Sequence, residues 1–355
     1  MDSGKRKEHE TMQGIPLEER KRLGALLDNE SQEAVMARIP QFGKAETDNF
    51  VAAPDKVTEK LGVLMFNMER GVHLAEIREF LRDCPDIQPF DVILANELDD
   101  GCARSGNRNT ARELAEAFGL NYAWGLEFIE LVNDENEKGF HGNAVFSRWP
   151  IRRAGVIRLP EEYNWYFDRQ KRIGGRLAVF AQLDVGGRPV GAVSIHLENR
   201  THGEGRRRQM ETILKAVRRE LPDMPVILGG DLNTNPFDGR AKEDIGQIAA
   251  SPELRRQCLE GVFDYEPLLP MAAAEGYQIV PGEPKLTRRK PMPDGSFLPL
   301  RLDWILLKNA QAEESRMVST AREDFTYAAP GSALASFAGK ELSDHNAVWA
   351  MCWLK

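Results

Sequence analysis

Short apolar runs, separated by glycine, proline and asparagine, begin near Leu61 and alternate with helical stretches from there on. Runs of this length that are rich in Val, Ile, Leu and Phe are typical of buried strands. The predicted strands are residues 62–67, 90–97, 143–147, 176–184, 190–197, 226–230, 302–307 and 346–354. A Gly-Gly pair within residues 185–189 predicts a β-hairpin between two of these runs, so at least part of the sheet should be antiparallel.

Helical spacing of apolar residues predicts helices between several of these strands. Residues 74–81 and 110–118 form two of them, and Gly119 ends the second. After Gly205 the apolar positions that recur at helical spacing are Met210, Ile213, Leu214, Val217 and Leu221. Helices that cover the faces of partly antiparallel sheets indicate a layered α/β or α+β architecture.

The chain divides into two parts by composition. Residues 1–56 are polar and mixed in charge, with one plausible helix at 17–27 and no strong strand, which predicts a partly ordered N-terminal extension. Residues 57–355 are the predicted main domain. Within it, residues 240–300 are rich in proline and glycine and are predicted to form long loops around a short helix.

Composition narrows the class of protein. The 355 residues, 42% hydrophobic and 29% charged, can bury the core of one large domain or two small ones. No stretch approaches the roughly 18 to 20 apolar residues of a transmembrane helix, and the N-terminus lacks an apolar signal core. A cytoplasmic protein is therefore expected, with a monomer as the default state.

Cysteine content and charge limit the possible partners. The four scattered cysteines make a disulfide framework or a zinc cluster improbable, so any metal should be held by oxygen and nitrogen. The formal net charge of -8 argues against a protein that coats nucleic acid through charge alone. It is compatible with a nuclease, because such an enzyme needs only a local basic rim.

Polar side chains lie at or near the ends of six apolar runs. They are Asn67, Glu97, His196, the pair Asp231 and Asn233, Asp303, and the pair Asp344 and His345. Phosphodiester hydrolysis needs a Lewis acid, an activated water and donors that stabilise the developing charge. Carboxylate and amide oxygens suit Mg²⁺ or Mn²⁺. Asp231 could deprotonate the water, and His345 could protonate the phosphoryl group if Asp303 orients it.

The same residues lie in motifs that resemble those of the endonuclease/exonuclease/phosphatase superfamily, the DNase I-like hydrolases. In chain order the motifs are Phe66-Asn67, Asn96-Glu97, His141-Gly142-Asn143-Ala144 with Ser147-Arg148, His196-Leu197, Gly229-Gly230-Asp231-Leu232-Asn233, Arg301-Leu302-Asp303-Trp304-Ile305 and Ser343-Asp344-His345. The resemblance covers roughly residues 61–355. It implies a four-layer α/β/β/α sandwich, in which two mixed sheets pack face to face and the site lies at one end.

The resemblance also implies roles for individual residues. Glu97 looks like the principal metal ligand for Mg²⁺ or Mn²⁺, with Asn67 beside it and Asp344 in or near the metal shell. Asp231 and Asn233 resemble the pair that positions the attacking water and binds phosphate. Asp303 and His345 resemble the carboxylate-imidazole pair, and His196 the second histidine of the DNase I and sphingomyelinase branches. Asn96 stands where the family commonly has glutamine.

Each candidate also has an ordinary structural interpretation. Asn67 and Asn233 could form turns, and the acidic run after Glu97 could be a solvated turn. His141, Asn143 and Arg176 are the predicted substrate- or phosphate-binding residues, although a surface salt bridge explains Arg176 as well. For His141 an orienting role is preferred over direct catalysis.

The substrate is the least determined feature. Two basic and aromatic segments, residues 163–172 and 288–290, could rim the site and stack with bases while their cations meet phosphates. The leading hypothesis is a metal-dependent phosphodiesterase with nucleic acid as the preferred substrate. The alternatives are a sphingomyelinase-like enzyme acting on phospholipid head groups, a small-molecule phosphoesterase, and a non-catalytic binding protein of the same fold.

Overall fold

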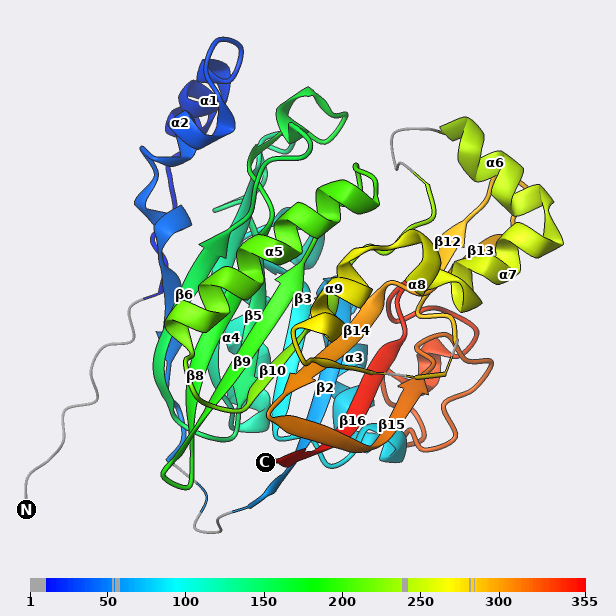
Figure 1. The fold of residues 1–355 in the computed structure, drawn as a ribbon. Coiled ribbons are helices and arrows are strands. Elements are labelled where there is room, and N and C mark those ends of the chain that lie inside the picture. The colour runs from blue at the N-terminus through cyan, green and yellow to red at the C-terminus, as the bar shows by residue number, and fades with distance from the viewer. Residues whose placement is uncertain (1–10, 53, 55–57, 238–241, 281, 284) are drawn as a thin grey trace, which may run out of the picture.

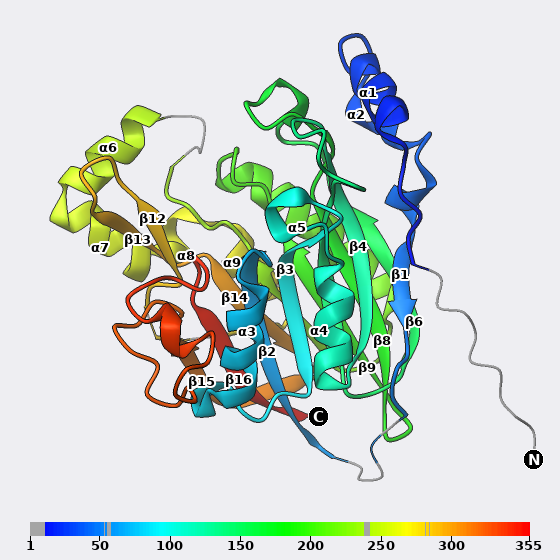
Figure 2. The same cartoon turned by 180° about the vertical axis from the view of Figure 1, so that it is seen from behind.

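The computed structural model describes residues 11–355, except for 53, 55–57, 238–241, 281 and 284. In this part of the chain two mixed β-sheets pack face to face, and helices cover their outer faces (Figure 1, Figure 2). The expected boundary between residues 56 and 57 lies outside the described residues. None of the helices in the described ranges is long and apolar enough to span a bilayer.

The first sheet combines the N-terminal half of the chain with its C-terminal strands. Within the described residues its order is β1 (Ala45–Asp48), β4 (Asn121–Glu130), β5 (Phe140–Ser147), β3 (Val92–Asp100), β2 (Lys60–Arg70), β16 (Ala347–Leu354) and β15 (Ala310–Val318), and β7 (Arg172–Gly174) also pairs with β4. Strands β2 and β3 are parallel, whereas the other pairs are antiparallel.

The second sheet is formed by the middle of the chain. Its order is β11 (Gln278–Val280), β14 (Asp303–Lys308), β10 (Val226–Asp231), β9 (Arg188–His196), β8 (Leu177–Val185) and β6 (Ile151–Arg158), and a separate two-stranded sheet pairs β12 (Arg288–Pro291) with β13 (Phe297–Leu300). Gly186 and Gly187, both with positive φ, turn β8 into β9, which confirms the predicted hairpin. Strands β9 and β10 are parallel.

Helices form the two outer layers. The described helices are α1 (Leu17–Leu26), α2 (Gln32–Met36), α3 (Leu74–Asp83), α4 (Thr110–Phe118), α5 (Gly203–Glu220), α6 (Lys242–Ala250), α7 (Pro252–Glu260), α8 (Val262–Tyr265) and α9 (Leu268–Ala274). Helices α3 and α4 pack on the first sheet, and α5 and α9 on the second (Figure 1, Figure 2). The four layers match the predicted sandwich.

Strand β2 shows why the sheets stack in this way. Its residues Leu61, Val63 and Met65 point into the core between the two sheets. Its residues Leu64 and Phe66 point to the other side, into the core under α3 and α4. Side chains of a strand alternate between faces, so a continuous apolar run is required where both faces are covered.

The N-terminal segment is more structured than its composition suggests. The predicted helix at 17–27 is confirmed as α1, but the expectation of no strand there is wrong, because β1 pairs with β4 at the edge of the first sheet. Leu23, Val35 and Phe42 enter the core of this sheet. Polar residues of β1 are stabilised by partners, such as Glu46, which accepts from Tyr122 Oη at 2.5 Å.

The expectation of long loops at 240–300 is also wrong. The described residues of this region form α6 to α9 and β11 to β13, and Ile248, Cys258, Leu298 and Leu300 share a small core of their own. Pro252 is the first residue of α7, a position that does not require its missing N–H.

Candidate functional site

The polar strand ends meet at one end of the two sheets. In the first sheet, Asn67 on β2 lies opposite Asn96 on the parallel strand β3. In the second, Asp231 on β10 lies opposite His196 on β9 and opposite Asp303 on β14. The carboxyl ends of parallel strands share one edge, so these register pairs collect the predicted site residues there.

Backbone irregularities aim consecutive residues into the site. The strand registers shift between Asn67 and Arg70 and between Ala95 and Leu98, and φ is positive at Glu69, Arg70 and Glu97. A left-handed conformation at a residue other than glycine costs about 1–3 kcal/mol and is found mainly at functional sites. Because a bulge interrupts the alternation of a strand, neighbouring residues can both serve the same site.

Asp231 is the central carboxylate. Its Oδ1 accepts the backbone N–H of Asn233 at 2.9 Å, and its Oδ2 accepts from Asn67 Nδ2 at 3.2 Å. The Nε2 atoms of His345 and His196 lie 3.6 and 3.7 Å from the same Oδ2. The side chain is buried, so four neighbours hold this carboxylate in one position.

Asp303 and His345 form a buried pair beside Asp231. His345 Nδ1 lies 2.9 Å from Asp303 Oδ2, and its Nε2 faces the carboxylates of Asp231 and Asp344. Burial alone would lower the pKa of His345, but the three carboxylates outweigh it and raise this pKa to about 9. An imidazole with carboxylates at both nitrogens is held in the doubly protonated form.

Glu97 projects into a cavity of about 170 Å³ that also receives Asp231 and His345. Although burial opposes ionisation, Arg70 and the nearby histidines hold the pKa of Glu97 well below its usual range. From beneath, Asn143 Oδ1 accepts the Glu97 backbone N–H at 3.2 Å. Glu97 therefore presents a fixed, ionised carboxylate to the cavity.

Acidic groups crowd the same cavity. Asp344 is bound by Arg288 at 2.5 Å, and its backbone N–H donates to Glu69 Oε2 at 3.1 Å. Burial and the charges of Asp344 and Glu97 raise the pKa of Glu69. A hard cation would relieve this repulsion, and oxygen donors are what Mg²⁺ or Mn²⁺ prefers. The donor set thus fits a divalent metal ion.

A second place in this site also has metal-ligand geometry. Asp231, Asp303 and His345 each offer a ligand atom, and these atoms lie within 4.8 Å of one another. This buried group could hold a metal ion. Among the described residues, none forms a hydrogen bond with Asp303 Oδ1, whereas Asp303 Oδ2 is already engaged by His345.

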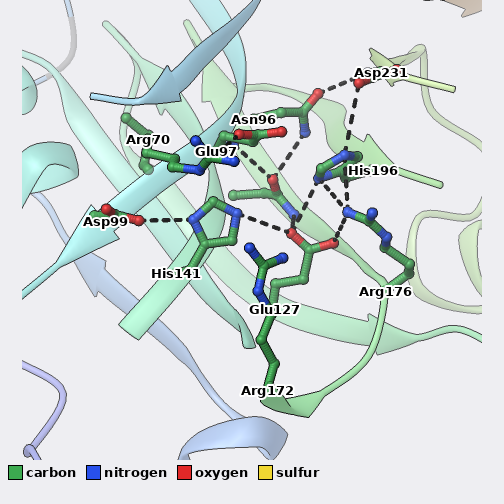
Figure 3. A network of polar contacts seen from close by, with 12 residues as sticks. Arg70, Asn96, Glu97, Asp99, Glu127, His141, Arg172, Arg176, His196 and Asp231 are labelled. Carbon is green, nitrogen blue, oxygen red and sulfur yellow. Dashed lines mark hydrogen bonds and ion pairs between the residues drawn. The ribbon is translucent and has the colours of Figure 1, made fainter. Parts of the chain in front are cut away.

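A buried network of charged groups continues from His196 away from Asp231 (Figure 3). Glu127 accepts from Arg176 Nη1 at 3.0 Å and lies 3.1 Å from His196 Nδ1. Burial opposes ionisation, yet His196 and Arg176 lower the pKa of Glu127 to about 2. His141 Nδ1 bonds to Asp99 at 2.8 Å, a second carboxylate-histidine pair. Ion pairs of this kind fix the side chains that reach the cavity.

The comparison with known families agrees with this geometry. The profile described as "Endonuclease/Exonuclease/phosphatase family" matches residues 66–345. The chain belongs to the endonuclease/exonuclease/phosphatase family. Its fold is therefore that of a phosphoesterase-type hydrolase, as the motifs predicted. No curated protein matches the chain.

Several solved structures resemble this chain at low sequence identity. A conserved protein of unknown function from Enterococcus faecalis V583 covers 83% of this chain and 100% of its own, at 13% identity and a TM-score of 0.50. An endonuclease/exonuclease/phosphatase from Beutenbergia cavernae DSM 12333 covers 83% of this chain and 72% of its own, at 19% identity and a TM-score of 0.49. The human nocturnin catalytic domain covers 88% of this chain and 98% of its own, at 17% identity and a TM-score of 0.48.

The structure brings the predicted residues of the family site together in two layers. The first layer lines the cavity of about 170 Å³, called the smaller cavity below, and consists of Glu97, Arg176, His196, Asp231, Asn233, Asp344 and His345. Asn67, Asn143 and Asp303 lie fully buried beneath it. Asn67 turns its amide nitrogen to the carboxylates while its oxygen accepts from the Glu69 N–H at 3.1 Å. Asn143 holds the backbone of Glu97 rather than lining a cavity.

Several residues of the site were not predicted from the sequence. Glu127 is the partner of Arg176 and Asp99 the partner of His141 in the buried network, and Glu69 and Arg70 line the smaller cavity. The signal for Glu127 was an acidic residue inside the apolar run 121–130. The acidic run after Glu97 is not a solvated turn, because Asp99 and Asp100 are buried and paired with Arg104 and Lys138. Arg176 is likewise a buried ion pair.

The two basic and aromatic segments take different positions. Arg288 lines the smaller cavity, but Arg289 is turned inward and paired with Glu341. Segment 163–172 borders a larger adjoining cavity of about 760 Å³. Only the first residue of 288–290 therefore faces the smaller cavity, whereas much of 163–172 faces the larger one.

The N-terminal segment holds segment 163–172 in place through Gln32. Gln32 Nε2 donates to Asn164 Oδ1 and to the Arg172 carbonyl, both at 3.0 Å, and Gln32 Oε1 accepts the Gly174 N–H at 2.9 Å. We expect Gln32→Ala to lower the free energy of unfolding by about 1–3 kcal/mol, since each lost hydrogen bond contributes about 1 kcal/mol. Urea unfolding of this variant and of the Gln41→Ala control measures the change in free energy of unfolding. Equal stability of the two variants would contradict the prediction.

Proposed function

We propose that this protein is a divalent-metal-dependent phosphodiesterase. The observation that carries this proposal is the arrangement of Glu97, Asp231 and His345 around one cavity of about 170 Å³. These three groups supply a metal ligand, a general base and a proton donor, the set that phosphoester hydrolysis requires. The proposal agrees with membership of the family, which gives the phosphoesterase fold but not the substrate.

Glu97 is the proposed principal ligand, with Asp344 beside it and Asn67 beneath. When bound, Mg²⁺ or Mn²⁺ would polarise the phosphoryl oxygens and offset the charge that develops on them. We prefer this position to the Asp231, Asp303 and His345 group, because His345 Nδ1 and Asp303 Oδ2 already bond to each other at 2.9 Å.

Asp231 is the proposed base for the attacking water. Asn67 Nδ2 and the Asn233 N–H orient its two oxygens, so the carboxylate needs no reorganisation to accept a proton. His345, oriented by Asp303, presents Nε2 to the same cavity and donates a proton to the oxygen of the leaving group as its bond to phosphorus breaks. Arg176 and His196 also line this cavity, with Arg176 Nη1 3.0 Å from His196 Nδ1. The Arg176 guanidinium group would there stabilise the phosphoryl oxygens.

Nucleic acid is the proposed substrate class, since arginines of segment 163–172 continue the site beyond the metal position. Nicking of supercoiled plasmid and cleavage of single-stranded DNA and RNA by metal-stripped protein, with Mg²⁺ restored, test it. Cleavage that requires both Mg²⁺ and Asp231 supports the proposal. Hydrolysis of phospholipid vesicles or small phosphodiesters alone would assign the rival substrates, and no hydrolysis of any of these would contradict the proposal.

A further inference from the structure

The larger cavity opens directly beside the proposed reaction centre. It has a volume of about 760 Å³, within the range of small-molecule sites. Both cavities are lined by Arg70, Glu97, Arg176, His196 and Asn199. A substrate whose phosphate lies in the smaller cavity can therefore extend into the larger one without leaving the protein surface.

Positive charge is concentrated on the walls of the larger cavity. Its described lining includes five arginines, Arg70, Arg169, Arg172, Arg176 and Arg200, against the two carboxylates Glu97 and Asp168. The guanidinium carbons of Arg172 and Arg176 both lie 5.0–5.4 Å from the ring centroids of Phe128 and Trp165, so the two groups are arranged around the same pair of rings. Several cations that line one cavity favour the binding of an anion there.

Buried carboxylates hold these guanidinium groups in fixed positions. Arg176 is paired with Glu127 and with Glu198, and Arg172 with Glu130. In Figure 3, Arg172 at the start of β7 and Arg176 in the link between β7 and β8 both point toward Glu127. A guanidinium group held by ion pairs loses little freedom on binding phosphate, and its planar fork suits that ligand.

Trp165, the aromatic residue of segment 163–172 among the arginines, does not offer an open stacking face, and the exposed Phe167 is not among the residues that line the larger cavity. Trp165 is buried, its Nε1 donates to Glu198, and Arg172, Arg176 and Arg200 lie 5.0–5.8 Å from its ring centroid. Within the segment that was expected to stack with bases, Trp165 is therefore not available for stacking. Its ring supports the arginines, so the cavity is built to recognise an anion rather than a base.

We propose that the larger cavity is a subsite for a second phosphate group of the substrate, with Arg172 and Arg200 as its specificity residues. This inference rests on the proposed function, because it places the first phosphate beside Glu97 and Asp231. The substrate class is a phosphodiester that carries another phosphate close to the scissile one. That group is either the neighbouring phosphate of a nucleic acid strand or a phosphate on a small molecule.

The test compares two dinucleotides that differ by one phosphate, TpT and its 5′-phosphorylated form pTpT. The wild type should hydrolyse pTpT with a kcat/KM about tenfold or more above that for TpT, the gain expected of a charge-assisted contact. Arg200→Gln should lower this ratio about fivefold or more, mainly through KM, and so should Arg172→Lys, which keeps the charge but not the fork. Arg219→Gln on the exposed face of α5 is the control and should leave the ratio unchanged.

Arg172→Lys should fold, because Glu130 keeps Arg104 as an ion-pair partner at 3.1 Å. A ratio near one in the wild type, or equal losses on both dinucleotides in Arg200→Gln, would overturn the subsite. Hydrolysis of a 12-nucleotide single-stranded DNA distinguishes the two possible sources of the second phosphate. An Arg200→Gln loss on the strand equal to that on pTpT supports a backbone phosphate, and a loss confined to pTpT supports a small-molecule phosphate.

Binding of inorganic pyrophosphate, measured by calorimetry, tests the subsite without turnover. The Kd should rise about tenfold in Arg200→Gln and stay constant in Arg219→Gln. If pyrophosphate binding depends on Arg200 but the wild type hydrolyses no phosphodiester, the subsite is supported and the proposed function fails. Binding of the same strength in both variants would overturn the subsite even if the wild type hydrolyses phosphodiesters.

Discussion

His345→Ala should lower kcat for phosphodiester hydrolysis by about 10²- to 10⁴-fold, the usual contribution of a positioned proton donor. Asp303 orients this imidazole at Nδ1, and Nε2 faces the cavity shared with Asp231. The loss should be greatest when the leaving group is a nucleoside alkoxide. It should be smaller for p-nitrophenolate, because that group leaves without a proton. Steady-state rates on a dinucleotide and on bis(p-nitrophenyl) phosphate measure the difference.

A matched histidine variant separates this effect from damage to the fold. His73 precedes α3, packs against Phe337 and lines neither cavity, so His73→Ala should retain activity on both substrates. Far-UV circular dichroism should show both variants folded. Losses of equal size on both substrates in His345→Ala would refute proton donation by this residue.

Glu97→Gln should reduce activity by about 10²-fold or more and should raise the Mg²⁺ concentration needed for half-maximal rate. The substitution preserves shape but removes the ionised oxygen that the arginine and histidines around Glu97 stabilise. Loss of an electrostatic contact to the transition state has an effect of this size. Rates measured across a Mg²⁺ titration, after removal of metal with a chelator, provide the test.

The control for Glu97→Gln is Glu116→Gln on the outer face of α4, where the lost carboxylate pairs with Arg112 at the surface. Its Mg²⁺ response should match the wild type. An unchanged Mg²⁺ requirement in Glu97→Gln, with the rate reduced or not, would show that the metal is bound elsewhere. The group of Asp231, Asp303 and His345 would then be the next candidate.

Strand-end residues of the site could be predicted from the sequence because their position follows from the strands themselves. A buried strand is an apolar run, and the first polar residue after it marks an edge of the sheet. Asp231 after the predicted run 226–230 and His196 near the end of the run 190–197 were found in this way, and the register of β9 and β10 places them opposite each other. The resemblance of the motifs then implied the four-layer sandwich, which no local pattern contains.

Residues that act through long-range pairs could not be predicted in this way. Glu127 lies within β4, and its partners, His196 on β9 and Arg176 in the link between β7 and β8, make its burial possible. Strand β15 reads as polar because it is an edge strand with exposed charged residues. The residues of 240–300 form elements because they share a small core, which depends on tertiary contacts.

The position of Arg172 is another feature that depends on distant contacts. Its segment appeared in the sequence as a basic and aromatic rim, but the ring of Trp165 is covered by guanidinium groups. Gln32, 140 residues earlier in the chain, holds the Arg172 carbonyl. The shape of the larger cavity thus depends on an N-terminal segment that composition alone described as an extension.

The most direct measurement is hydrolysis of bis(p-nitrophenyl) phosphate by metal-stripped protein, with Mg²⁺ or Mn²⁺ restored, for the wild type and Asp231→Asn. This diester needs no particular base, lipid or second phosphate. We expect hydrolysis by the wild type that requires the metal, and a loss of about 10²-fold or more in the isosteric variant. Metal-independent hydrolysis, or a rate in Asp231→Asn equal to that of the wild type, would contradict a metal-dependent phosphodiesterase built on this site.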